Sequence, residues 1–217
     1  MNSFDWSAVA DFMPDFWDGV LVTLQVLVLG SVISFTLGLV WALLFRAPTR
    51  FVRWPVNLFT EFIRTTPLLV QLFFFFFVLP EAGIQFSALT TGTLAIGLHY
   101  STYTAQVYRA GIEAVPKGQW EAATALSLPT HRTWVAVILP QAFRRVMPAL
   151  GNYVIAMLKD TPILLAIGVL EMLNEARQFG AQTFQYTEPL TVVGIAFILI
   201  AYPASLLVRA LERRLVR

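Results

Sequence analysis

The stretch Val20–Phe45, VLVTLQVLVLGSVISFTLGLVWALLF, contains 26 residues and no Asp, Glu, Lys or Arg. A helix needs about 20 such residues to cross the roughly 30 Å hydrocarbon core of a bilayer. The composition agrees, because 57% of the 217 residues are hydrophobic and only 13% are charged, against about 25% charged in soluble domains. The sequence therefore predicts an all-α integral membrane protein.

Four more candidate spans follow this one, at Thr65–Leu79, Ala88–Tyr108, Val146–Leu170 and Pro189–Val208. The third and fifth of the five spans carry no charge. The second reaches full length only if it extends back through Glu61 and Arg64, and the fourth contains Lys159 and Asp160. We therefore predict about five transmembrane helices, with uncertain ends for the second and fourth.

Basic residues alternate between the connections. Residues 46–53, 109–145 and the tail from 209 are rich in Arg and Lys, whereas residues 1–19 and 81–87 contain none. Because basic residues are enriched on the cytoplasmic side, this pattern predicts an external N-terminus and a cytoplasmic C-terminus. That orientation requires an odd number of spans, and five satisfies it. We treat residues 1–217 as a single transmembrane domain.

The long connection 109–145 contains a predicted short helix at Gln119–Leu128. Pro116 precedes it, Pro129 ends it, and Glu121 in its first turn suits the helix dipole. A helix this short has little stability alone in water, so we expect it to dock into another protein. The alternative is a helix lying on lipid, but its weakly basic character argues against that.

Residues 118–127, GQWEAATALS, resemble the EAA loop of ABC importer permeases. More narrowly, the chain resembles the polar-amino-acid family of these permeases, from about residue 15 to the C-terminus. The other blocks that carry the resemblance, in chain order, are EFIRTTPLLVQ (61–71), YRAGI (108–112), LPQA (139–142), PALGN (148–152) and KDTP (159–162).

This resemblance implies the transmembrane domain of a type I ABC importer in a bacterial inner membrane, as a multi-pass permease. The short helix would be a coupling helix that docks on a cytoplasmic dimer of ATP-binding subunits. A second permease, the same or similar, would complete the pathway, and an extracytoplasmic binding protein would deliver the solute. The implied coupling residues are Gly118, Gln119, Glu121, Ala122, Ala123, Leu126 and Ser127, with Gly118 permitting the tight entry to the helix and the alanines allowing close approach of the ATPase.

Three positions depart from the family pattern. The family usually has Gly at Ser127, so the turn after the coupling helix should be stiffer here. It usually has Arg-Gly-Thr-Pro where this chain has Arg64-Thr65-Thr66-Pro67, and commonly Glu at Gln106. The last change removes a charge from a span and weakens any ionic role at that position.

Polar side chains inside the spans indicate a solute pathway, because such groups usually face a cavity or one another. Pro162 predicts a helix break after Asp160 that would open the backbone to a cavity; Lys159 and Asp160 could instead form a structural ion pair. Glu61 and Arg64 could pair with each other or meet a partner subunit, and His99 could be a structural hydrogen-bonding group. The candidate pathway residues are Glu61, Arg64, Thr66, His99, Tyr100, Tyr103, Gln106, Lys159, Asp160 and Thr161.

The polar stripe of Tyr100, Tyr103 and Gln106 suits a zwitterion. Segments 99–119 and 189–214 also resemble the ectoine and hydroxyectoine branch of the family, so we expect an ectoine-like compatible solute, with a polar amino acid as the second choice. An ion-coupled secondary transporter is the alternative function. The chain has no cysteine, phosphate loop or catalytic set, so we expect no enzyme activity, metal or nucleic-acid partner, and no cofactor in this chain. ATP-Mg would bind the partner ATPase.

Overall fold

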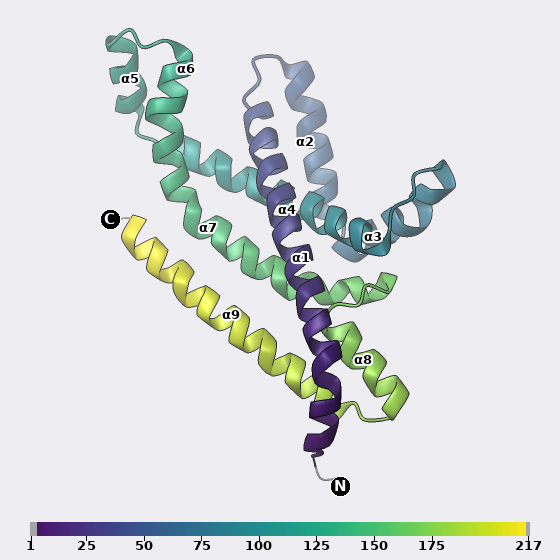
Figure 1. Ribbon diagram of the computed structural model, residues 1–217. Helices are drawn as coiled ribbons and strands as arrows, with labels where there is room; N and C mark the ends of the chain where they lie inside the picture. The colour runs from purple at the N-terminus through teal and green to yellow at the C-terminus, as the bar shows by residue number, and fades with distance from the viewer. Residues whose placement is uncertain (1–3, 216–217) are drawn as a thin grey trace.

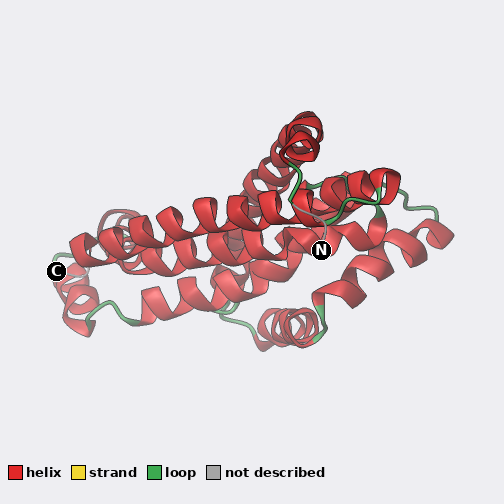
Figure 2. Cartoon of the chain, turned by 90° about the horizontal axis from the view of Figure 1, so that it is seen from below, coloured by secondary structure: helices red, strands yellow, loops and turns green. Residues whose placement is uncertain are grey.

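The computed structural model describes residues 4–215, and all regular structure within that range is helical (Figure 2). The helices are α1 (Trp6–Leu44), α2 (Arg50–Thr65), α3 (Leu68–Phe73), α4 (Ala88–Glu113), α5 (Lys117–Ala125), α6 (Thr130–Arg132), α7 (Leu139–Asp160), α8 (Met172–Thr183) and α9 (Thr187–Leu215). Four π or 3-10 segments connect them, namely η1 (Phe74–Val78), η2 (Leu79–Ala82), η3 (Thr133–Ile138) and η4 (Thr161–Ile167).

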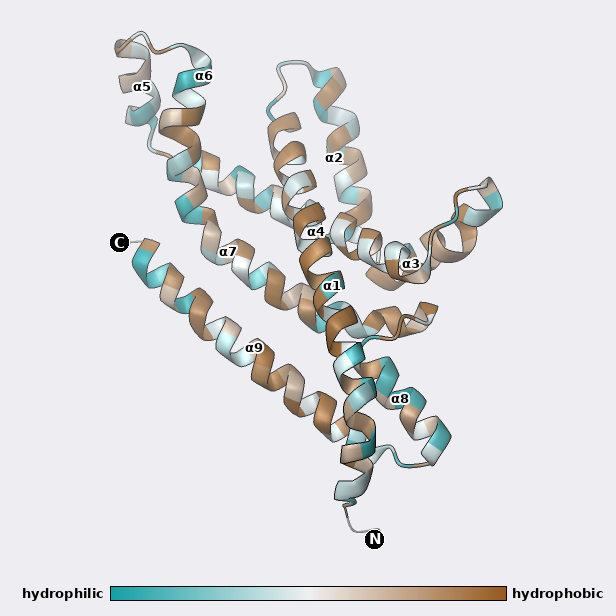
Figure 3. Cartoon of the chain, in the orientation of Figure 1, coloured by the Kyte–Doolittle hydropathy of each residue, from teal (hydrophilic) through white to brown (hydrophobic). Residues whose placement is uncertain are grey.

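Three helical runs in the described residues are long and apolar enough to cross a membrane. They are α1, the run Thr130–Ile167 and α9, and the colouring of Figure 3 marks the hydrophobic residues along the chain. The pair Arg50–Thr65 and Leu68–Ala82 makes a fourth if its bend of 104° lies within one span. The predicted third span, α4, has 26 residues, or about 39 Å of helix. Because it carries many Thr, Ser and Tyr residues, it is not among the helices that are apolar enough to cross a membrane by this measure, although the sequence predicted it as a span.

The two ends of the molecule differ in character. In Figure 1, α5 and the turn between α1 and α2 lie at one end, and the N-terminal part of α1 lies beside α8 at the other. The charge pattern predicts the first end to be cytoplasmic and the second external. Most of the predicted helix α5 is confirmed, although it covers Lys117–Ala125 rather than Gln119–Leu128.

Two predicted connections are wrong in extent. The fourth span was expected to begin at Val146, but helical structure already begins at Thr130, so the connection 109–145 is mostly helix. The sequence did not predict this helix because Arg132, Arg144 and Arg145 suggested a loop. A helix that continues outside the bilayer can contain charged residues. The connection between the last two spans also contains α8, in which the Glu171 carboxylate caps the helix by accepting from the N–H groups of Asn174 and Leu173, at 2.8 and 3.0 Å.

Small residues allow α1 and α4 to pack closely. Gly30, Ser34 and Gly38 recur every four residues along α1, and all three face α4. Thr104 of α4 donates a 2.9 Å hydrogen bond to the carbonyl oxygen of Ser34. The spacing on α1 therefore serves helix packing within this chain.

Carboxylates gather at the predicted external end. Burial raises the pKa of Glu175 on α8, and the nearby charges of Asp15, Asp18 and Glu171 raise it further. Burial also raises the pKa of Glu171, against the opposing effect of its two backbone hydrogen bonds. The contact between α1 and α8 is tight, since a Cβ placed on Gly19 would lie 2.9 Å from the Cα of Met172.

Candidate functional site

Three tyrosines from two helices form an aromatic cluster inside the bundle. Tyr100 and Tyr103 of α4 have ring centroids 6.0 Å apart, and Tyr153 of α7 lies 6.0 and 5.9 Å from them. His99 adds a fourth ring, 5.5 Å from Tyr100 and 5.2 Å from Tyr103. The faces of such rings attract cations, and their hydroxyl groups can bind polar atoms.

This cluster contacts the end of α7. The Tyr100 hydroxyl donates a 2.6 Å hydrogen bond to Oδ2 of Asp160, the last residue of α7. The predicted end of the α-helix at this point is confirmed, and the chain continues as the 3-10 segment η4. The buried Thr161 hydroxyl donates to the carbonyl oxygen of Leu158 at 2.8 Å, so this side chain satisfies a backbone group at the transition.

Lys159 and Asp160 point apart. Lys159 is exposed on the surface of the chain, whereas Asp160 is half-buried. Only two ion pairs occur among residues 4–215, and neither involves these two side chains. The alternative of a structural Lys159–Asp160 pair is therefore wrong for this structure, in which a tyrosine holds the carboxylate.

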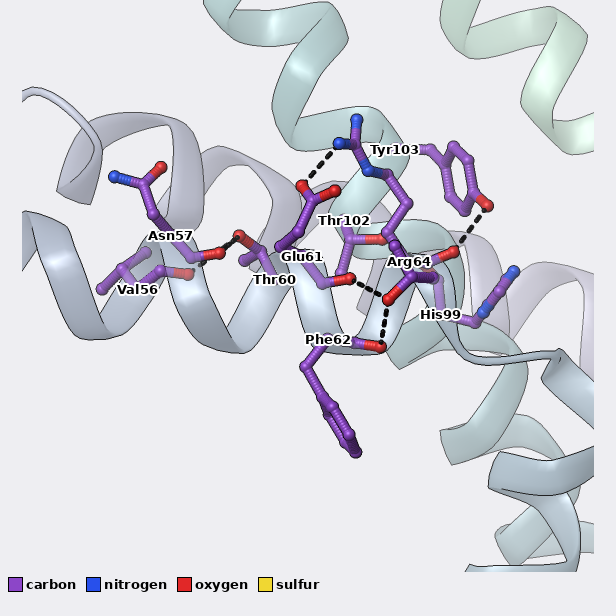
Figure 4. A network of polar contacts seen from close by, with 10 residues as sticks. Val56, Asn57, Thr60, Glu61, Phe62, Arg64, His99, Thr102 and Tyr103 are labelled. Atoms are coloured by element: carbon purple, nitrogen blue, oxygen red, sulfur yellow. Dashed lines mark hydrogen bonds and ion pairs between the residues drawn. The ribbon is translucent and has the colours of Figure 1, made fainter.

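The end of α2 borders the same cluster (Figure 4). Arg64 and Glu61 form an ion pair with a 2.6 Å N–O distance, as their spacing predicted, and both are partly exposed. Tyr103 donates a 3.2 Å hydrogen bond to the carbonyl oxygen of Arg64. The Thr66 hydroxyl donates to the carbonyl oxygen of Phe62 at 2.7 Å and so helps to close the end of the helix.

Gln71 of α3 stabilises the bend between α2 and α3. Its buried Nε2 lies 2.7 Å from the carbonyl oxygen of Ile63, 2.8 Å from that of Thr66 and 2.9 Å from Nδ1 of His99. His99 is thus a buried hydrogen-bonding group at this bend, as its structural interpretation predicted. Gln106 is half-buried on α4, one turn beyond Tyr103.

The exposed surface of α5 is narrower than expected. Glu121, Ala122 and Ser127 are exposed, and Leu126 is 73% exposed. Ala123, predicted to face a partner, is only 3% exposed and packs against this chain, because a short helix lying on the bundle must bury one face. Gln119 is exposed, and its Oε1 accepts from Gln141 at 3.0 Å.

The residues Ser127 and Gly118, at the two ends of α5, were both expected to shape the backbone there. Ser127 has a φ of 53°, in the left-handed region that a non-glycine residue adopts at a cost. Among residues 4–215, no atom lies within 4 Å of a Cβ placed on Gly118, so no contact in this part of the chain requires a glycine there. The tight entry predicted at Gly118 has no counterpart in this structure.

Two tryptophans hold α5 against the bundle. The ring centroids of Trp120 on α5 and Trp134 on η3 lie 5.3 Å apart in an edge-to-face arrangement. The guanidinium group of Arg46, in the turn after α1, lies 5.9 and 5.5 Å from the two centroids. Arg145 of α7 donates to the carbonyl oxygen of Ala114. The ring contacts connect the exposed helix α5 to η3 and to the turn after α1, and Arg145 connects α7 to the end of α4.

Comparison with known proteins decides the family. Residues 34–217 match the model of the family described as binding-protein-dependent transport system inner membrane component. The chain belongs to this family. It is a multi-pass permease subunit of the bacterial inner membrane and not an enzyme, since ATP hydrolysis in such systems resides in a partner protein.

Similar proteins are named as permeases of amino-acid transport systems. It is 50% identical over 89% of its length to a probable amino-acid ABC transporter permease of Sinorhizobium fredii, of which 84% is covered. It is 33% identical to the arginine transport permease ArtQ of Bacillus subtilis and 35% identical to the glutamine transport permease GlnP of Escherichia coli, each over 98% of both chains.

Comparison with solved structures points to the same kind of transporter. A chain of an amino acid ABC transporter, solved with histidines, superposes with a TM-score of 0.90 at 33% identity, covering 98% of the permease and 100% of that chain. The methionine transporter MetNI, at 19% identity and a TM-score of 0.74, shows the shared fold alone. The permease is therefore a subunit of an amino-acid type ABC importer, which disfavours the ion-coupled alternative.

Proposed function

We propose that this permease moves a small zwitterion, an amino acid or an ectoine-like solute, along a path beside Tyr100, Tyr103 and Tyr153. The observation that carries the proposal is the aromatic cluster that contacts Asp160 where α7 ends. A zwitterion needs a site for its cation and a site for its carboxylate. The described residues offer both signs of charge next to aromatic rings.

The cation would lie against the tyrosine rings near Asp160. Ring faces attract cations, and the second carboxylate oxygen of Asp160 has no hydrogen bond among residues 4–215. Exposed Lys159 and the partly exposed pair of Arg64 and Glu61 would face a second permease across the path. In this proposal the solute carboxylate is bound by Lys159 or Arg64.

Coupling to ATP hydrolysis would occur at α5. Glu121, Ala122 and Leu126 form the exposed face that we propose enters a groove of the cytoplasmic ATPase dimer. Gly118, Gln119 and Ser127 border this face, and Ala123 supports it from beneath. ATP-Mg would bind the ATPase, and this chain would hold no cofactor. A binding protein outside the membrane and a second permease, identical or similar, would complete the importer.

Two solute classes satisfy this chemistry. The names of the relatives favour an amino acid. The resemblance of segments 99–119 and 189–214 to the ectoine branch favours ectoine or hydroxyectoine, which also combine a carboxylate with a delocalised cation. Both are zwitterions, so the tyrosine cluster suits either class.

Calorimetric titration of the cognate binding protein tests the solute. The panel contains ectoine, hydroxyectoine, glutamine, arginine, histidine and cystine, each followed by uptake into proteoliposomes that hold the complete transporter. Tight binding and uptake of one zwitterion support the proposal, and the identity of that solute separates the two classes. Transport of an uncharged sugar or an inorganic anion, with no response to any zwitterion, would refute it.

A further inference from the structure

A polar cavity of about 730 Å³ opens at the predicted cytoplasmic ends of α1, α2 and α4. Its lining residues are Phe45, Arg46, Arg50, Arg53, Trp54, Asn57, Arg109 and Glu113. Four arginines therefore face one glutamate. The Nε of Arg109 pairs with that glutamate at 2.9 Å, and no other ion pair at this cavity occurs among residues 4–215. Three positive charges are left uncompensated, which favours an anionic ligand.

A second cavity of about 540 Å³ adjoins the first and is apolar. Arg50, Phe51, Trp54 and Pro55 line it, and Arg50 and Trp54 line both cavities. Phe51 is 93% exposed and Trp54 is 61% exposed. Tryptophan is enriched where membrane proteins meet the head-group region of the bilayer. The two cavities together place a charged compartment directly beside a hydrophobic one.

The start of α2 adds to the attraction for an anion. This helix begins at Arg50, has no acidic residue in its first turn, and receives no side-chain cap from Thr49. The N–H groups of Val52 and Arg53 donate to the carbonyl oxygen of Thr49, which leaves those of Arg50 and Phe51 without a partner in the described residues. These two groups can bind an anion, and the helix dipole favours negative charge at this end.

We propose that the arginine cavity binds the phosphate of an anionic phospholipid from the cytoplasmic leaflet, with an acyl chain against Phe51, Trp54 and Pro55. A guanidinium group can donate two parallel hydrogen bonds to the oxygens of one phosphate. Basic pockets between membrane helices on the cytoplasmic side bind anionic head groups. The adjoining apolar cavity favours a lipid over a soluble phosphate, because only a lipid carries an acyl chain that can contact the exposed aromatic rings.

This lipid would affect transport through Arg46. The same guanidinium group lines the arginine cavity and lies over Trp120 and Trp134, which hold α5 in place. A phosphate in the cavity would fix the position of Arg46 and so steady the helix that we propose to couple to the ATPase. We therefore expect anionic lipid to raise solute-stimulated ATP hydrolysis as well as to bind.

The test compares the complete transporter in nanodiscs of phosphatidylcholine with and without about 30% phosphatidylglycerol, an anionic lipid of the class that basic sites bind. Native mass spectrometry measures retained phosphatidylglycerol, and ATP hydrolysis is measured in parallel. Arg50→Gln/Arg53→Gln should weaken lipid retention about twenty-five-fold, at roughly fivefold for each arginine, and should remove the stimulation. The control Arg213→Gln/Arg214→Gln, in the last turn of α9, removes the same charge and should behave as wild type.

A lysine variant tests whether positive charge alone is sufficient to hold the lipid. Arg50→Lys/Arg53→Lys keeps the charge but loses paired hydrogen bonds, so it should retain lipid at an intermediate level even if the glutamine variant fails to fold. Equal retention by wild type and both Arg50/Arg53 variants would overturn the proposal. Displacement of phosphatidylglycerol by millimolar inorganic phosphate or glycerol phosphate would also overturn it, by assigning the cavity to a soluble anion.

Discussion

The hydroxyl group of Tyr100 donates a 2.6 Å hydrogen bond to Oδ2 of Asp160 and thereby joins α4 to the last residue of α7. The bond lies where the α-helix gives way to the 3-10 segment η4. Asp160 has no basic partner in the described residues, so this hydrogen bond sets its orientation. This hydrogen bond joins the two helices that border the proposed path, beside the ring contacts of Tyr153 with Tyr100 and Tyr103.

Asp160→Ala should reduce solute uptake at least tenfold. A hydrogen bond to a charged group contributes about 1.5–3 kcal/mol, which corresponds to roughly tenfold to hundredfold in an equilibrium constant. Tyr100→Phe should cause a smaller loss, because the carboxyl group of Asp160 would remain in place. Uptake by proteoliposomes measures both. Tyr202→Phe, at an exposed tyrosine of α9, serves as the control, and wild-type uptake by the Asp160 variant would contradict the prediction.

Glu121→Lys should abolish transport and solute-stimulated ATP hydrolysis while leaving membrane insertion intact. Glu121 is exposed on α5 and makes no ion pair among residues 4–215, so its replacement should disturb a partner and leave this chain folded. The measurements are co-purification of the ATPase and its rate with solute-loaded binding protein. Glu212→Lys reverses an exposed charge near the end of α9 and should have no effect. Normal coupling in the Glu121 variant would refute the assignment of α5.

Ser127→Gly should stabilise the turn after α5 by about 1 kcal/mol, because only glycine adopts positive φ without cost. Ser127→Val should destabilise it, since a β-branched residue tolerates that conformation worst. Thermal unfolding of the purified transporter measures both changes. If neither Ser127→Gly nor Ser127→Val changed the unfolding midpoint, the positive φ at this turn would not limit stability, which would contradict the prediction.

The membrane class, the exposed helix and the end of α7 were all predictable from the sequence, since each depends on composition or on proline placement. The contacts of the site were not. Tyr153 precedes Asp160 by two helical turns and so shares its face, but nothing in the sequence pairs it with Tyr100. Gln71 and Trp134 likewise find their partners, His99 and Trp120, only once the helices are packed.

The same limit explains the errors. Ala123 was assigned to the partner-facing side because its segment resembled a docking helix, and only the packing of α5 shows which face is buried. The helix across residues 130–145 was missed because arginines there suggested a loop. Charge marks the edge of the bilayer, and a helix can continue beyond that edge.

Glu175→Gln should flatten the pH dependence of stability at the external end. The pKa of Glu175 is raised in the folded protein by burial and by Asp15, Asp18 and Glu171. The folded state therefore binds a proton more readily than the unfolded state, so this group disfavours folding at pH 7 and ceases to do so as the pH falls below its ordinary value near 4.5. As the pH is lowered from 7 to 5, the unfolding midpoint of the wild type should therefore rise relative to that of Glu175→Gln. Parallel plots of midpoint against pH for the two proteins would contradict this.

Gly38→Ala should destabilise the contact between α1 and α4 by about 1–3 kcal/mol, the usual cost of overpacking. A Cβ at Gly38 would overlap the side chain of Thr104, which donates to the carbonyl oxygen of Ser34. Gly194→Ala is the matched control, because no atom of the described residues lies within 4 Å of a Cβ there, and it should leave the unfolding midpoint unchanged or raise it. Adding Thr104→Ala to Gly38→Ala should recover part of the loss by removing the overlapping hydroxyl. Equal midpoints for the two alanine variants would show that the small-residue stripe does not set the approach of these helices.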